Sequence, residues 1–200
     1  NSAIYTNTTE SGNTAIGEKK KKKNTIGGDN TASGYYALRV NTEGINNTAN
    51  GAFALRENTT GINNTANGKS ALYSNTTGVN NTASGRSSLF FNTVGENNVA
   101  IGFQSLNSNR AGSNATAIGT NAMQNANSTT TAFINQNVAV GYEALRGSVT
   151  PANNTGYSNT GVGYQSLFSI SSGYNNVAIG NSALYNNTTG FQNTANGSFS

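Results

Sequence analysis

The sequence predicts an all-β repeat protein, a parallel β-solenoid or β-roll built from coils of about 17 residues each. The first observation is a recurring phrase, NVAIGFQSL at residues 98–106, which returns as NVAVGYEAL at 137–145 and as NVAIGNSAL at 176–184. The second is its spacing, because the glycine of the phrase recurs with one constant period over most of the chain, as at Gly51, Gly68 and Gly85. A short fixed period of this kind is typical of a solenoid or another stacked-repeat architecture.

The third observation is the composition of one unit, which residues 68–84 show as GKSALYSNTTGVNNTAS. A helical array needs apolar residues at helical spacing and few glycines, and this unit has neither. It holds instead two short segments of period two, around Thr-Ala-Ile-Gly and around Ala-Leu, which we predict to be strands. The Asn-Thr-Thr-Gly sequences between them are typical of turns.

The whole chain, residues 1–200, is predicted to be a single repeat array. At one strand spacing per unit, ten units form a rod about 50 Å long. The chain begins and ends inside a unit, so we expect it to be a fragment of a longer chain. Two units are longer than the others, namely those that end at Gly141 and Gly163. The coil-starting glycines are Gly17, Gly34, Gly51, Gly68, Gly85, Gly102, Gly119, Gly141, Gly163, Gly180 and Gly197.

Stacked coils place equivalent residues in columns, and a Leu column and an Ala column form the predicted interior. They make a thin core against a backbone ordering cost of roughly 1–2 kcal/mol per residue. A further column, which is apolar only in the C-terminal half of the chain, offers a second face, so we expect several copies to pack along a shared axis. The Leu column is Ile4, Leu38, Leu55, Leu72, Leu89, Leu106, Met123, Leu145, Leu167 and Leu184; the Ala column runs from Ala15 to Ala195 with Gly161 as its gap; and the second face is Ile101, Ile118, Val140, Val162 and Ile179.

Asparagines form a column too, and stacked amides are expected to hydrogen-bond along the rod. The same repeat creates Asn-x-Ser/Thr sequons, for example at Asn58, Asn75, Asn114 and Asn187, although turn chemistry explains these residues without glycosylation. The column is Asn13, Asn30, Asn47, Asn64, Asn81, Asn98, Asn137, Asn159, Asn176 and Asn193.

Composition excludes several classes of protein. Apolar residues are 34% and charged residues 9%, and because disorder usually combines low hydrophobicity with high net charge, the strict period predicts order. Five of the positive charges lie together at residues 19–23, so the net charge of +4 becomes −1 without them. No distributed basic face for nucleic acid is therefore expected. No signal peptide or membrane-spanning segment is visible, and this segment is not expected to insert into a membrane.

No catalytic, cofactor or metal site is predicted. The chain has no His, Cys or Trp, so Ser-His and Cys-His nucleophiles and imidazole or thiolate metal sites are excluded. The seven carboxylates fall in seven different columns, so no two of them stack as a glycosidase acid/base pair. Pairing between adjacent turns or across chains stays open.

The lysine run at residues 19–23 contradicts the repeat locally. Gly17 and Gly34 are still one full period apart, so the lysines replace part of a coil, and Lys20 and Lys21 take the Ala and Leu positions. A buried ammonium group is costly unless it is paired. We expect an opened coil or an uncertain stretch of sequence, with an anion or acidic-glycan site as the alternative.

The phrase Asn-Val-Ala-Ile-Gly-x-x-Ser/Ala-Leu resembles the head repeats of trimeric autotransporter adhesins, the YadA-like group. It is also similar to the Asn-Thr-Ala-x-Gly-x-x-Ala-Leu repeats of tail and fibre proteins from phages and bacterial injection particles. The resemblance covers essentially the whole chain and implies a left-handed parallel β-roll, in which three chains associate into an extracellular attachment fibre. The longer period and the Asn-Thr-Thr-Gly turn of this sequence depart from the adhesin pattern and favour the fibre branch.

Receptor contacts are predicted where the repeat is broken, between Gln124 and Gly156. Insertions in solenoids emerge as loops on one face, often the binding face. Two aromatic columns lie nearby: Phe103, Tyr142 and Tyr164, and Tyr157, Tyr174 and Phe191. They offer either a sugar-binding surface or mere stacking along the rod. The candidate contacts are Thr130, Phe133, Ile134, Pro151, Tyr157 and Tyr174.

The leading functional hypothesis is a homotrimeric extracellular fibre segment that attaches a cell or a virus-like particle to a surface glycan or protein receptor. One alternative is an ice-binding solenoid that uses the threonine column starting at Thr14, although Val99, Val138 and Val177 interrupt this column. The other alternative is a tailspike-like glycan lyase or hydrolase.

Overall fold

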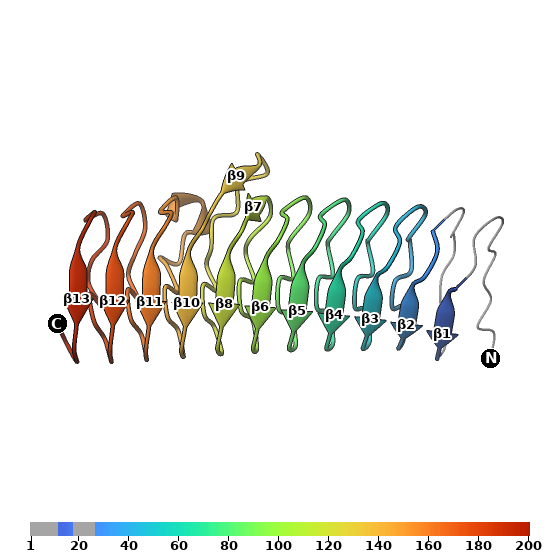
Figure 1. The fold of residues 1–200 in the computed structure, drawn as a ribbon, viewed down its shortest axis with the longest axis horizontal. Coiled ribbons are helices and arrows are strands. Elements are labelled where there is room, and N and C mark those ends of the chain that lie inside the picture. The colour runs from blue at the N-terminus through green and yellow to red at the C-terminus, as the bar shows by residue number, and fades with distance from the viewer. Residues whose placement is uncertain (1–11, 18–26) are drawn as a thin grey trace.

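The computed structural model describes residues 12–17 and 27–200, which wind into a rod of stacked coils (Figure 1). Each coil contributes one three-residue strand to a parallel eleven-stranded sheet, and the strands follow one another in chain order. The predicted all-β parallel solenoid, with most coils of the predicted length, is thereby confirmed. The strands are β1 (Thr14–Ile16), β2 (Thr31–Ser33), β3 (Thr48–Asn50), β4 (Thr65–Asn67), β5 (Thr82–Ser84), β6 (Val99–Ile101), β8 (Thr116–Ile118), β10 (Val138–Val140), β11 (Thr160–Val162), β12 (Val177–Ile179) and β13 (Thr194–Asn196).

Strand register places like residues on like residues. Thr48 pairs with Thr65, Ala49 with Ala66, and Asn50 with Asn67. The central residue of each strand points into the coil, whereas its two neighbours point outward, as the alternation of a strand requires. Because the outward residues repeat at every rung, the sheet presents two parallel rows of side chains on its outer face.

The Ala-Leu segment, predicted as a second strand, is instead a series of turns. Phe53 and Leu55 lie in the left-handed region at φ 64° and 47°, and the equivalent residues of the other coils repeat these angles. The segment still bonds from coil to coil, because the Leu55 N–H donates to the Ala71 carbonyl at 3.0 Å. The alternating pattern of this segment therefore comes from an arch in which every second residue has a left-handed backbone angle. The arch hydrogen-bonds along the rod but is not an extended strand.

The glycine that follows each strand sets the period of the repeat. Gly51 has φ 131°, and a Cβ atom placed on it would lie 2.7 Å from the carbonyl carbon of Gly68 in the next coil. Neither the angle nor the space accommodates a side chain, since only glycine adopts such a conformation at little cost. The coils therefore stack backbone on backbone at this corner.

The predicted interior is confirmed for the described residues. In the coil of β3, Ala49, Ala54 and Leu55 are fully buried, and the same positions are buried in most other coils. Gly161 interrupts the Ala column where the side chain of Leu145 fills the space, because a Cβ atom on this glycine would lie 2.2 Å from Leu145 Cδ1. Ile4 and the lysines at residues 19–23 lie outside the described residues.

The predicted asparagine column is a buried ladder, which we call the strand ladder because each member precedes a strand. Oδ1 of Asn47 accepts from the N–H of Asn64 at 3.0 Å and from its Nδ2 at 3.1 Å. Nδ2 of Asn64 also donates to the Gly78 carbonyl at 2.8 Å. The buried amide of Asn64 thus joins its own coil to the coils on both sides, and its polar atoms have the partners that burial demands.

A second buried ladder, the turn ladder, was not predicted as such. Nδ2 of Asn58 donates to Oδ1 of Asn41 at 2.7 Å and to the Gly61 carbonyl at 3.0 Å. Asn58 and Asn75 are fully buried members, so these two sequons are inaccessible to glycosylation in the folded coil. The members are Asn41, Asn58, Asn75, Asn92 and Asn109.

Both ladders are interrupted next to the two long coils. In the strand ladder, Ala115 takes an asparagine position, and Oδ1 of Asn135 replaces the missing acceptor by receiving the N–H of Asn137 at 3.0 Å. The turn ladder stops at Asn109, whose buried Oδ1 has no partner, because Ala126 follows it in the column. The extra residues are thus accommodated with one repaired rung and one broken ladder.

Candidate functional site

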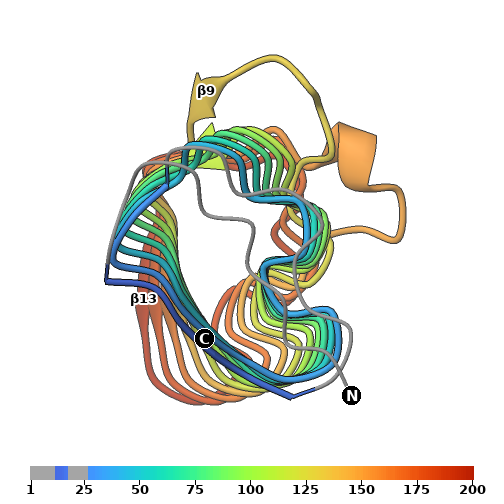
Figure 2. The same ribbon diagram turned by 90° about the vertical axis from the view of Figure 1, so that its right-hand side faces the viewer.

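The two inserts project from the side of the coil opposite the eleven-stranded sheet (Figure 2). The first contains β9 (Phe133–Ile134), which pairs in parallel with β7 (Gly112–Ser113) of the preceding coil. The second contains the 3-10 turn η1 (Pro151–Asn153). The predicted loops on one face are therefore present, and one of them is ordered by a small sheet of its own.

Local hydrogen bonds shape the first insert. Oδ1 of Asn127 accepts from the N–H of Thr129 at 2.8 Å, and Oγ1 of Thr129 accepts from the N–H of Thr131 at 3.3 Å. Such side-chain turns are typical of Asn and Thr. The returning strand then seats Phe133 directly over Gly112, since a Cβ atom on this glycine would lie 2.6 Å from Phe133 Cζ.

Asn154 holds the base of the second insert closed. Its Oδ1 accepts from the N–H of Ser148 at 3.0 Å, and its Nδ2 donates to the Ser148 carbonyl at 3.0 Å. The same Nδ2 donates to the carbonyl of Asn125, which belongs to the first insert. One buried amide therefore fixes both inserts relative to each other.

A groove of about 560 Å³ lies between the inserts. Phe133 and Ile134 from β9, together with Tyr157, supply its large apolar side chains, and Ile134 is 57% exposed. Hydroxyl groups and one amide supply the polar part, and none of the lining side chains is a carboxylate, ammonium or guanidinium group. The lining residues are Asn127, Ser128, Thr129, Thr131, Ala132, Phe133, Ile134, Ala152, Thr155 and Tyr157.

The structure brings together three of the six predicted contact residues, Phe133, Ile134 and Tyr157. Thr130 is exposed on the same loop but does not line the groove, and Pro151 begins the turn whose next residue lines it. Tyr174 lies behind Tyr157, with ring centroids 5.3 Å apart and planes at 6°. Sequence reasoning missed Asn127, Thr129 and Thr155; the run of hydroxyl residues beside Phe133 was the available signal.

The aromatic columns pack as stacks along the rod. Tyr174 and Phe191 continue the Tyr157 stack at 5.1 Å and 5°, and Tyr142 stacks on Tyr164 at 5.4 Å and 11°. Rings stacked in this way turn their edges, and not their faces, toward solvent. Stacking along the rod, one of the two alternatives, thus accounts for most of these rings.

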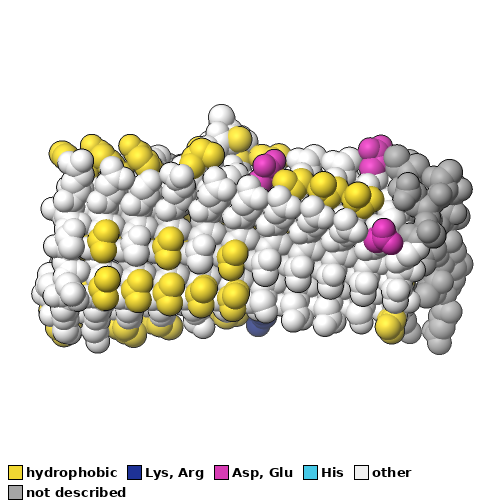
Figure 3. All heavy atoms as spheres, viewed as in Figure 1, with side chains coloured by type: hydrophobic (Ala, Val, Ile, Leu, Met, Phe, Trp, Pro, Cys, Tyr) yellow, Lys and Arg dark blue, Asp and Glu magenta, His cyan; other side chains and the backbone are white. Residues whose placement is uncertain are grey.

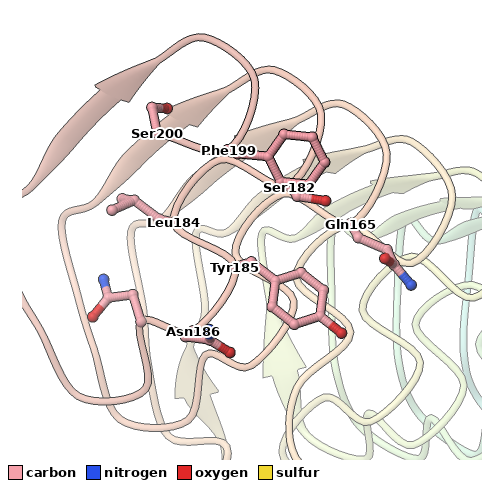
Figure 4. Close-up of a pocket in the computed structure, with 8 residues that line it drawn as sticks. Gln165, Ser182, Leu184, Tyr185, Asn186, Phe199 and Ser200 are labelled. Carbon is pink, nitrogen blue, oxygen red and sulfur yellow. The ribbon is translucent and has the colours of Figure 1, made fainter.

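A larger hollow of about 610 Å³ lies at the last coils, over Leu184 and beside Tyr185 (Figure 4). Its walls are the side chains of Gln165, Ser182, Phe199 and Ser200, which continue columns of the rod. The hollow is therefore lined by the same kinds of side chain as the columns elsewhere in the rod, and it adds no new chemical group.

Chemical groups for other classes of site are sparse in the part of the chain that the structure describes. Residues 12–17 and 27–200 contain no group of three His, Cys, Asp or Glu side chains close enough to hold a metal ion. None of their helices is long and apolar enough to cross a membrane. Comparisons of the chain with protein-family models, with curated proteins and with solved structures give no match.

Proposed function

We propose that this chain is a rigid segment of a homotrimeric extracellular fibre, wound left-handed, that attaches a cell or a virus-like particle to a surface. The resemblance of its repeats to adhesin heads and tail fibres motivates the proposal. The rod supports it mechanically, because the backbone hydrogen bonds of the eleven-stranded sheet join every coil to the next. The strongest support comes from the side chains on the outer face of the sheet.

Rows of exposed and half-buried branched apolar side chains lie on this face over β6 to β12 (Figure 3). Ile101 is 41% exposed and Ile179 is 44% exposed, and Ile118, Val140 and Val162 complete the row between them. Val99, Val138 and Val177 form a shorter row beside it. A soluble monomer rarely leaves such a contiguous apolar surface in water, so this face supports packing against copies of the chain.

The thin interior supports the same arrangement. A coil such as that of β3 buries one leucine, two alanines and two asparagine amides. Full burial of an exposed valine or isoleucine contributes about 1.5–3 kcal/mol. These side chains are already partly buried, so each one that becomes fully buried between copies would add only part of that amount. The inserts project from the opposite side of the coil, so packing through the sheet leaves the groove accessible (Figure 2).

The oligomeric state tests the proposal. Light scattering on the purified segment is expected to give about three times the chain mass of 20.6 kDa. A folded chain that stays monomeric at high concentration would refute the fibre, whereas a dimer would keep lateral packing and refute the trimer.

Ice binding is a second candidate, favoured by the N-terminal half of the same face. Thr14, Thr31, Thr48, Thr65 and Thr82 are exposed at successive rungs, with a Ser or Asn beside four of them. Rungs about 4.8 Å apart make a regularly spaced hydroxyl array. Thermal hysteresis well above that of a control protein would support this function, and its absence would exclude it.

A further inference from the structure

The groove between the inserts contains the first ring of an aromatic stack, Tyr157. Tyr174 covers one face of the Tyr157 ring. The residue at the equivalent position of the preceding coil is Asn135, whose carbonyl accepts from the N–H of Ser158 at 3.0 Å, so no ring covers the other face of Tyr157. Tyr157 is 44% exposed and lines the groove.

Polar groups around this ring are hydroxyls and an amide. Ser128, Thr129, Thr131 and Thr155 supply hydroxyls, and Asn127 supplies the amide. These groups both donate and accept hydrogen bonds, as a ligand rich in hydroxyls requires. Phe133 and Ile134 add apolar surface next to them.

We propose that this groove binds a neutral oligosaccharide, with the apolar face of one sugar ring stacked on Tyr157 and the sugar hydroxyls bonded to the threonine side chains. The inference rests on the proposed function, which it deepens by naming the ligand class through which the fibre attaches. The volume of about 560 Å³ falls within the usual range for small-ligand sites.

Other ligand classes fit the lining less well. An acidic glycan, a nucleotide or a phosphorylated group would lack a cationic partner, because the groove has none. An acyl chain would leave the hydroxyl and amide groups of the rim without partners. A peptide added as a strand would find only the two residues of β9, which is too short an edge for such pairing.

The test begins with the full chain on an array of neutral oligosaccharides of hexoses and N-acetylhexosamines, with sialylated and sulfated glycans as charged counterparts. Each glycan that binds is then titrated in solution. Binding to one or more neutral glycans is expected, whereas retention of charged glycans alone, or of no glycan, would overturn the proposal.

Three variants assign any binding to the groove. Tyr157→Ala is expected to weaken binding about tenfold or more, because it removes the stacking surface, and Tyr157→Phe is expected to retain it within about threefold. Phe191→Ala is the matched control: this ring ends the same stack and is 54% exposed, but it does not line the groove. Equal losses in Tyr157→Ala and Phe191→Ala would overturn the assignment.

Two further results separate this inference from the fibre. A chain that binds neutral glycans as a monomer would keep the groove and refute the fibre. A trimer that binds no neutral glycan would keep the fibre and refute the groove as a glycan site. The folding of each variant is checked by thermal melting in circular dichroism. If Tyr157→Ala does not fold, Thr131→Val replaces it, since this variant keeps the side-chain volume and removes one hydroxyl. Unchanged glycan affinity of Thr131→Val would then count against the proposal.

Discussion

Among single residues, one amide side chain accounts for much of the order in this protein. A small apolar core would normally leave such a chain poorly stabilised. Here Asn64 is fully buried and forms bonds to coils on both sides of it, while Asn63 beside it is exposed. Neighbouring residues of the same type therefore have different energetic roles, which makes them a matched pair.

Asn64→Ala is expected to lower the free energy of unfolding by about 2–4 kcal/mol, because it leaves the buried N–H of Asn81 without its acceptor and removes one of the two donors to the Gly78 carbonyl. For a chain of this size, the melting temperature should fall by roughly 5–10 °C.

Asn63→Gly is the control. Asn63 has φ 57°, which glycine adopts freely, and it loses only exposed amide bonds to Asn46 and Asn80. Its cost should stay below about 1 kcal/mol. If both variants melt alike in calorimetry, burial of the ladder is not what stabilises the rod.

Within the coil, the repeating element of the rod, the extra residues of the two inserts are held by specific amide side chains. Asn135 supplies the acceptor that Ala115 lacks, and Asn154 closes the second insert. The inserts are thus tied to the coil by a few specific amides, and the ladder of strands passes beneath them without interruption.

Trimming the inserts tests whether they carry binding alone. Residues 124–136 are replaced by a copy of 107–114, and 146–158 by a copy of 168–175, which returns both coils to the length of the regular repeat. Ala115→Asn is included because trimming removes Asn135. Melting should stay within a few degrees, since only backbone outside the ladder is lost.

Attachment of the trimmed chain to its target surface should be abolished. A control chain with Ala115→Asn and intact inserts separates the effect of the added amide. Undiminished attachment by the trimmed chain would mean that the segment is a spacer whose binding tip lies elsewhere.

At the scale of the whole rod, the outer face of the sheet is polar in one half and apolar in the other. The sheet is covered with Thr, Asn and Ser over β2 to β5, and with Val and Ile over most of β6 to β12 (Figure 3). The interior columns do not change along the rod in this way. Lateral association is therefore expected to be concentrated in the C-terminal half.

Ile179→Asp places a charge in this apolar row and is expected to shift light scattering from about three chain masses to one. Asn67→Asp makes the equivalent change at an exposed position of the polar half and should leave the assembly intact. If Ile179→Asp assembles as well as the parent chain, the row is not the interface.

The repeat, the parallel solenoid, the buried Leu and Ala columns and the strand ladder could all be predicted from the amino-acid sequence. This was possible because every coil has the same local packing constraints. Gly51 and its equivalents have no room for a Cβ atom, so these glycines mark the period directly in the sequence. The position of the inserts followed as well, since a coil longer than the regular repeat must expel the excess.

Other features depend on neighbours from different coils, and these needed the folded structure. The Ala-Leu segment became an arch, because Leu55 bonds to the next coil at a left-handed backbone angle that alternation cannot reveal. Asn58, which has the sequence of a turn residue, became a ladder member through its stacked partners. The groove forms because Asn154 fixes the two inserts relative to each other. The repeat period predicts the lengths of these inserts but not the directions in which they project.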